Sequence, residues 1–107
     1  IREWKDLTKI VQLKSEGKKL LEEAFVAAKL GAHVIMIDTG RKQDIERVDL
    51  ILRKNGLREK VKIAFGGEIN IQDLKVLKRM PVDIVDIGKA IVDAPLLDMK
   101  MDVLRRT

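Results

Sequence analysis

Short apolar runs alternate with longer amphipathic segments along this chain of 107 residues. Four of the runs have the length and the β-branched content of buried strands, and they cover residues 9–13, 34–37, 61–65 and 82–87. Strands that are separated by helix-length segments usually form a parallel sheet. The pattern therefore predicts an α/β fold with four parallel strands and helices packed outside them.

Two helices are predicted between the first three strands. The apolar positions of the first recur at helical spacing, with Gly31 as its C-terminal cap, and are Leu20, Leu21, Ala24, Phe25, Ala27, Ala28 and Leu30. The second has the apolar positions Ile45, Val48, Leu50, Ile51 and Leu52, and ends at Asn55-Gly56. Its charged residues are expected mostly on the solvent side: Asp44, Glu46, Arg47, Asp49, Arg53 and Lys54.

A third helix is predicted between the last two strands. Asn70 is a suitable N-cap with Asp73 three positions later, and the helix has to stop before Pro81. A further apolar rhythm from residue 95 to residue 104 resembles another amphipathic segment. Strand and helix together recur at roughly 25-residue intervals, as expected for repeated βα units.

Glycines mark the ends of the last two predicted strands. Gly66 and Gly67 follow the third strand, and Gly88, with Lys89 beside it, follows the fourth. We expect both turns to lead into helices. Glycine lets the backbone approach an anion closely, and the unpaired N–H groups at a helix start favour negative charge. These four residues are therefore predicted to bind phosphate, with the Lys89 ammonium as a point charge.

The chain length limits the architecture that these elements can build. A closed (β/α)8 barrel typically needs roughly 250 residues, so 107 residues suffice for about half of one. We therefore predict a single partial (β/α) barrel domain over residues 1–107, a TIM-barrel-like half-barrel. The exposed edges of such a sheet should pair with a second copy or with a missing N-terminal half, which predicts an oligomer or a larger assembly.

Candidate chemistry lies at the carboxyl ends of the first two strands. Asp38 follows the second strand and is the leading candidate for a catalytic or metal-binding group, since Mg²⁺ prefers ionised oxygen ligands. Thr39 comes next to it, and Gln12 and Lys14 end the first strand at the same predicted rim. These three are candidate ligand contacts. A helix cap or turn is the structural alternative for Asp38, and a solvated strand end is the alternative for Gln12 and Lys14. Asp86, near the last glycine turn, is expected to form a salt bridge or a cap.

Composition narrows the ligand class. The formal net charge of +5 would attract a phosphorylated small molecule, but three aromatic residues are too few for a base-stacking surface, which argues against nucleic acid. The chain has no cysteine and one histidine, so the usual zinc ligands are missing. No apolar run approaches the roughly 20 residues that span a bilayer, so we expect a cytoplasmic protein without a membrane partner.

Several of these segments resemble the C-terminal part of the barrel domain of the quinolinate phosphoribosyltransferase family, also called carboxylating nicotinate-nucleotide pyrophosphorylases. The resemblance extends from about Lys9 to Leu104. It is strongest in Gly-Ala-His-Val-Ile-Met-Ile-Asp ending at Asp38, in the Gly66-Gly67 turn, and in Val-Asp-Ile-Gly ending at Gly88, followed by Ala-Pro-Leu-Leu-Asp. The Ala-Pro-x-Leu-Asp segment separates this family from other phosphate-binding barrels.

The resemblance implies transfer of a phosphoribosyl group from phosphoribosyl pyrophosphate to a pyridine carboxylate, with Mg²⁺, in NAD biosynthesis. It assigns Asp38 to the magnesium-diphosphate and ribose portion of the ligand, and Gly66, Gly67 and Gly88 to the phosphate. The family has a glutamate where this chain has Gln12 or Lys14. Two alternatives remain open: a non-catalytic structural or regulatory half-barrel that a partner or second copy completes, and another phosphate-binding barrel enzyme.

Overall fold

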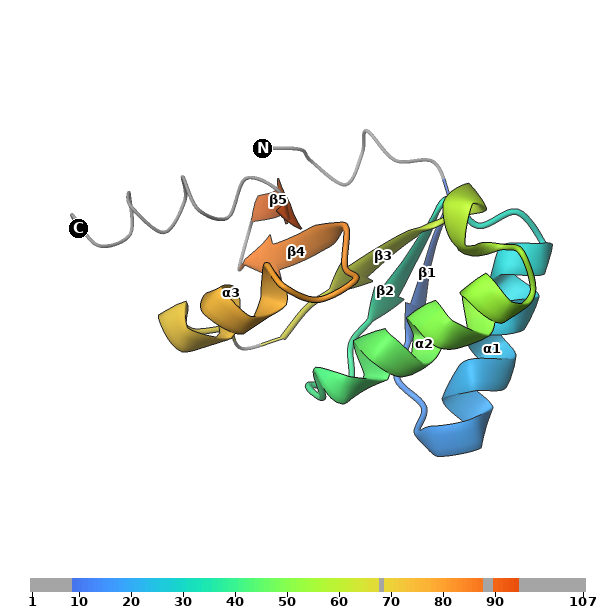
Figure 1. The fold of residues 1–107 in the computed structure, drawn as a ribbon, viewed down its shortest axis with the longest axis horizontal. Coiled ribbons are helices and arrows are strands. Elements are labelled where there is room, and N and C mark those ends of the chain that lie inside the picture. Colours follow the sequence, from blue (N-terminus) through green and yellow to red (C-terminus); the bar gives the residue numbers. More distant parts are fainter. Residues whose placement is uncertain (1–8, 68, 88–89, 95–107) are drawn as a thin grey trace.

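One mixed sheet and three α-helices make up the computed structural model, which describes residues 9–67, 69–87 and 90–94 (Figure 1). The strands are β1 (Ile10–Leu13), β2 (Val34–Ile37), β3 (Lys62–Phe65), β4 (Ile84–Ile87) and β5 (Ala90–Asp93). The helices are α1 (Gly17–Lys29), α2 (Gln43–Lys54) and α3 (Ile71–Leu77), with a 3₁₀ helix η2 (Arg58–Lys60) before β3.

The first four strands are parallel and lie side by side in the order in which they occur in the chain. Each is connected to the next by a segment that contains a helix, as parallel neighbours require. The predicted α/β class and the four parallel strands are therefore confirmed. The second predicted strand has the observed bounds, and the other three begin one or two residues later than predicted.

The segment after β4 differs from its prediction. A helix was expected to follow Gly88, but residues Ala90–Asp93 form β5, which pairs antiparallel with β4 through contacts such as Val85 with Val92. Val92 is buried in the same apolar cluster as Val85. Ile91 and Val92 are β-branched residues that suit a strand, and four residues are too few for periodicity to tell a strand from a helix.

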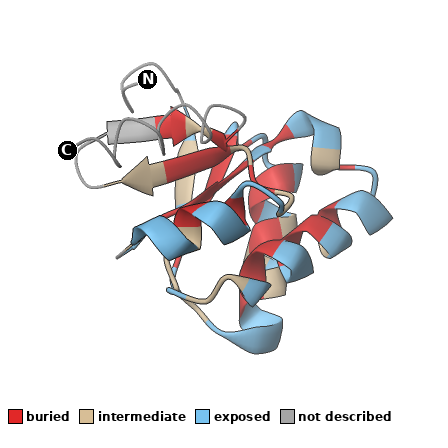
Figure 2. Cartoon of the chain, turned by 60° about the vertical axis from the view of Figure 1, so that its left-hand side comes forward, coloured by how far each residue is buried: buried red, intermediate tan, exposed pale blue. Residues whose placement is uncertain are grey.

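All three helices pack on one face of the sheet. Leu20 of α1, Leu52 of α2 and Leu74 of α3 belong to one buried cluster that also contains alternate strand residues such as Ile35 and Ile63. Figure 2 shows that the buried residues lie on the strands and on the helix surfaces turned towards them, whereas the outer helix surfaces are exposed. The opposite face, here called the inner face, has a separate apolar cluster: Ile10, Val34, Met36, Ala64 and Ile84.

Two details of the helix predictions are wrong. Asp44 and Asp49 of α2 were expected on the solvent side but are buried, because each is hydrogen-bonded to arginine side chains. Leu50 was expected in the apolar stripe but is 66% exposed, and Leu30 after α1 is exposed as well. The buried residues of α2 share one face of the helix, and Leu50 lies outside that face.

The predicted helix ends are confirmed. Gly31 follows α1 with φ +92°, and Gly56 follows α2 with φ +69°, a conformation that favours glycine. Asn70 caps α3: its side chain accepts a hydrogen bond from the Asp73 N–H, and the Asp73 carboxylate accepts one from the Asn70 N–H. Within the described ranges, no helix is long and apolar enough to cross a membrane.

Candidate functional site

The carboxyl ends of the four parallel strands bring four residues into one row on the inner face. The preceding row, on the helix face, consists of the aligned residues Leu13, Ile37, Phe65 and Val85. The residue after each of these four therefore falls in the following row, on the inner face. The Asp38 N–H donates to the Leu13 carbonyl, and the Gly66 N–H donates to the Ile37 carbonyl, which extends the alignment beyond the strands. We call this row the rim, and its members are Lys14, Asp38, Gly66 and Asp86.

The rim holds one cation, two carboxylates and a glycine. The Lys14 ammonium lies 4.0 Å from an Asp38 carboxylate oxygen, with both side chains partly exposed. Burial of the carboxyl, and secondarily the negative charge of Asp38, raises the pKa of Asp86 above its ordinary value. Asp38 and Asp86 thus act on each other electrostatically across the position of Gly66.

The two glycines after β3 have different structural roles. A Cβ atom on Gly66 would lie 3.2 Å from the Met36 sulfur and 3.4 Å from the Asp86 Cβ, so the missing side chain leaves room between β2 and β4. A Cβ atom on Gly67 would meet nothing within 4 Å, but the backbone has φ +128°, which other residues rarely adopt. Gly66 therefore keeps space open at the rim, and Gly67 permits the turn.

A cavity of about 340 Å³ lies on the inner face below the rim. Ile10, Gln12, Met36 and Asp86 line it, so one amide and one carboxyl group meet two apolar side chains there. Gln12 is one row before Lys14 on β1 and is aligned with Met36. The structure thus brings Gln12, Lys14, Asp38 and Gly66 together, as predicted for the ends of parallel strands.

Thr39 is directed to the loop that precedes α2. Its hydroxyl donates a hydrogen bond of 2.7 Å to the buried carboxylate of Asp44 and accepts one from the Arg41 N–H. The Arg41 guanidinium also donates to Asp44. These bonds hold the loop after β2 in place and thereby fix where β2 presents Asp38. The role of Thr39 as a ligand contact stays a prediction.

The start of α3 is already occupied by the protein itself. The capping box uses the Asp73 N–H, and the Asp73 carboxylate accepts a hydrogen bond of 2.6 Å from the Lys42 ammonium. This carboxylate stands where an anion would otherwise meet the helix dipole. The predicted phosphate contact at this turn therefore depends on the backbone of Gly66 and Gly67.

Sequence reasoning missed the importance of Asp86, which it treated as a cap or salt-bridge residue. In the described part of the chain Asp86 makes neither, and its Oδ1 atom is buried without a hydrogen-bond partner. The signal was present in the sequence: Asp86 lies two residues after Ile84 in a predicted strand, so the two share a face. Gly88 and Lys89, the remaining predicted phosphate contacts, lie outside the described residues.

The predicted Mg²⁺ site has few candidate protein ligands among the described residues. No group of three or more acidic, histidine or cysteine side chains that could hold a metal gathers within the described ranges. Mg²⁺, however, is commonly bound by one or two carboxylates together with substrate phosphates and water. The carboxylate of Asp38 fits that donor type.

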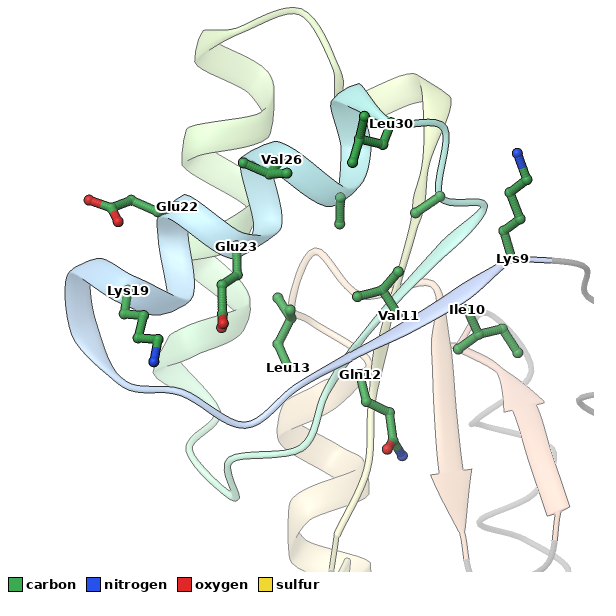
Figure 3. A pocket seen from close by; sticks show the side chains of 12 residues that line it. Lys9, Ile10, Val11, Gln12, Leu13, Lys19, Glu22, Glu23, Val26 and Leu30 are labelled. Atoms are coloured by element: carbon green, nitrogen blue, oxygen red, sulfur yellow. The ribbon is translucent and has the colours of Figure 1, made fainter.

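A second hollow lies along the edge strand, between β1 and α1. It has a volume of about 830 Å³ and a largely apolar lining. Figure 3 shows Val11 and Leu13 of β1 directed towards α1, where Val26 lines the same groove, whereas Gln12 points to the opposite side. The groove is thus on the helix face of the sheet, separate from the rim.

The fold and the rim define an α/β domain with a candidate ligand site at the carboxyl ends of parallel strands. Residues 4–102 match the quinolinate phosphoribosyl transferase C-terminal domain, and the chain belongs to that family. It is 34% identical over 83 residues to a probable carboxylating nicotinate-nucleotide pyrophosphorylase of Archaeoglobus fulgidus. The alignment covers 78% of this chain but 32% of that relative. No solved structure matches the chain significantly.

Proposed function

We propose that this chain is the phosphoribosyl-binding part of a phosphoribosyltransferase of NAD biosynthesis. In this proposal the ribose and the diphosphate of the ligand bind at the rim, and a pyridine carboxylate accepts the phosphoribosyl group. The observation that carries it is the row of Lys14, Asp38, Gly66 and Asp86 in a member of the quinolinate phosphoribosyl transferase family. The aligned relative, of which the alignment covers 32%, is named a probable carboxylating nicotinate-nucleotide pyrophosphorylase.

The rim residues suit different parts of such a ligand. The backbone at Gly66 and Gly67 can come close to phosphate oxygens, and the largely exposed Lys14 ammonium can reach an anion as a mobile point charge. Asp38 offers an oxygen ligand for Mg²⁺, which, when bound, neutralises charge on a diphosphate. Gln12 offers an amide that can both donate and accept hydrogen bonds.

Calorimetric titration with phosphoribosyl pyrophosphate and Mg²⁺ tests the proposal. Asp38→Asn keeps the size of the side chain and removes its charge, and it should weaken binding by about tenfold or more, as expected for a lost charged hydrogen bond or metal ligand. Glu46→Gln is the matched control, because Glu46 is exposed on α2, on the helix side of the sheet. Absence of saturable binding to the folded wild-type chain would refute the proposal.

The groove at β1 favours a second, structural role for the chain. An edge strand beside an apolar groove is a site where another strand and helix can be added. We propose that a second copy of the chain packs there. Light scattering should then give twice the 12.2 kDa mass of one chain, and Val26→Lys should reduce it to one. A monomeric wild-type chain at high concentration would contradict this role.

A further inference from the structure

Asp86 has a feature that its own surroundings do not explain. Its Oδ1 atom is buried and has no hydrogen-bond partner among the described residues. Buried carboxylate oxygens are normally paired, because desolvation without a hydrogen bond destabilises the folded state. An unpaired acceptor beside a cavity is therefore a position at which a ligand can supply the missing donor.

The groups around Asp86 restrict what that donor can be. The cavity beside it is lined by Ile10, Gln12 and Met36, of which only Gln12 is polar, and Gln12 is uncharged. Asp38 is close enough for its charge to act on Asp86, and the Lys14 ammonium lies beside Asp38. Among the described residues, two carboxylates and one ammonium make this part of the rim unfavourable for an anionic phosphate.

Hydroxyl groups satisfy this environment better than phosphate does. A hydroxyl donates a hydrogen bond to a carboxylate and carries no charge, and its oxygen can in turn accept a hydrogen bond from an amide such as that of Gln12. The room for such a group comes from Gly66, since a side chain there would crowd Met36 and Asp86.

We propose that Asp86 is a specificity-determining residue that accepts a hydrogen bond from a hydroxyl of the ribosyl portion of the ligand. This assignment rests on the proposed function, because it takes the ligand to be a phosphorylated ribose. It divides the rim: Gly66, Gly67 and Lys14 contact phosphate, whereas Asp86 and Gln12 contact the sugar.

Two probes that differ by the ribosyl phosphate unit test the assignment. Phosphoribosyl pyrophosphate and inorganic diphosphate are each titrated, with Mg²⁺ present, into the wild-type chain, Asp86→Asn and the control Glu46→Gln. Asp86→Asn should weaken binding of phosphoribosyl pyrophosphate by about tenfold, the loss expected for one hydrogen bond to a charged acceptor. Its affinity for diphosphate should stay the same or increase, because a nearby negative charge is removed.

The possible outcomes separate the two proposals. If the wild-type chain binds phosphoribosyl pyrophosphate and Asp86→Asn binds it equally well, Asp86 has no role in recognition, while the proposed function stands. If Asp86→Asn loses affinity for both probes to the same extent, or loses its circular dichroism spectrum, Asp86 supports the metal or the fold and the assignment is wrong. A wild-type chain that does not bind phosphoribosyl pyrophosphate overturns both proposals.

Discussion

Arg58 should contribute more to stability than any surface arginine, because its guanidinium connects three segments at the amino ends of the strands. It donates to the Asp49 carboxylate of α2 at 2.7 Å and to the Asp83 carboxylate before β4 at 3.0 Å. It also donates to the backbone carbonyls of Val61 and Pro81, at 3.0 and 3.1 Å. Its side chain is only 13% exposed.

The change Arg58→Met keeps the apolar stem and removes all four hydrogen bonds. Loss of one partner from a buried ion pair typically costs 3–5 kcal/mol, by order of magnitude. The cost here should be smaller, because Asp49 keeps its bond to Arg53, and Asp83 keeps one from the Ile63 N–H. We therefore expect the free energy of unfolding to fall by about 2–3 kcal/mol.

Urea denaturation followed by circular dichroism at neutral pH measures this change. Arg53→Met is the matched control, since Arg53 binds the same Asp49 carboxylate but is 61% exposed, and a surface pair of this kind contributes about 0.5 kcal/mol. The dependence of the unfolding free energy on urea should be unchanged in both variants. Equal destabilisation by the two substitutions would show that burial of the Arg58 network does not determine its strength.

Two further predictions concern the turn after β3 and the start of α3. Gly67→Ala should lower the free energy of unfolding by about 1–3 kcal/mol, because Gly67 has a φ of +128°. Gly66→Ala should lower it by less, since the flexible Met36 side chain can move away from the added Cβ atom. Equal losses of unfolding free energy in urea denaturation would contradict this prediction. The hydrogen bond from Lys42, followed by that from the Asn70 backbone, lowers the pKa of Asp73, so its carboxylate stabilises the fold above the ordinary carboxyl pKa. The difference in unfolding free energy between the wild type and Asp73→Asn should therefore shrink as the pH falls below about 4. A difference of the same size in acid would show that the ionised Asp73 carboxylate is not the stabilising group.

Much of the candidate site follows from the sequence once the strands are placed. Asp38 and Gly66 directly follow apolar runs, and the ends of parallel strands share one edge of a sheet, so their proximity was predictable. Asp86 could have been included by counting residues along β4, because alternate residues of a strand share a face. The engagement of Thr39 by Asp44 could not, since it depends on how the loop before α2 folds back.

The alternation of strands and helices can be read from the sequence, because strand-length apolar runs and helical spacing are local patterns. So can the caps at Gly31, Gly56 and Asn70, where the residue type has a direct conformational or hydrogen-bonding effect. These features depend on interactions within a few neighbouring positions.

The burial of particular polar residues and the pairing of the strands depend on the folded arrangement as a whole. Asp44 and Asp49 resemble solvent-facing helix residues until arginines from other positions pair with them. Ala90–Asp93 becomes a strand because β4 offers it an edge, with Val92 buried beside Val85. The unpaired oxygen of Asp86 likewise results from neighbours that are distant in the chain, since burial and hydrogen bonding are properties of the assembled sheet and not of a sequence window.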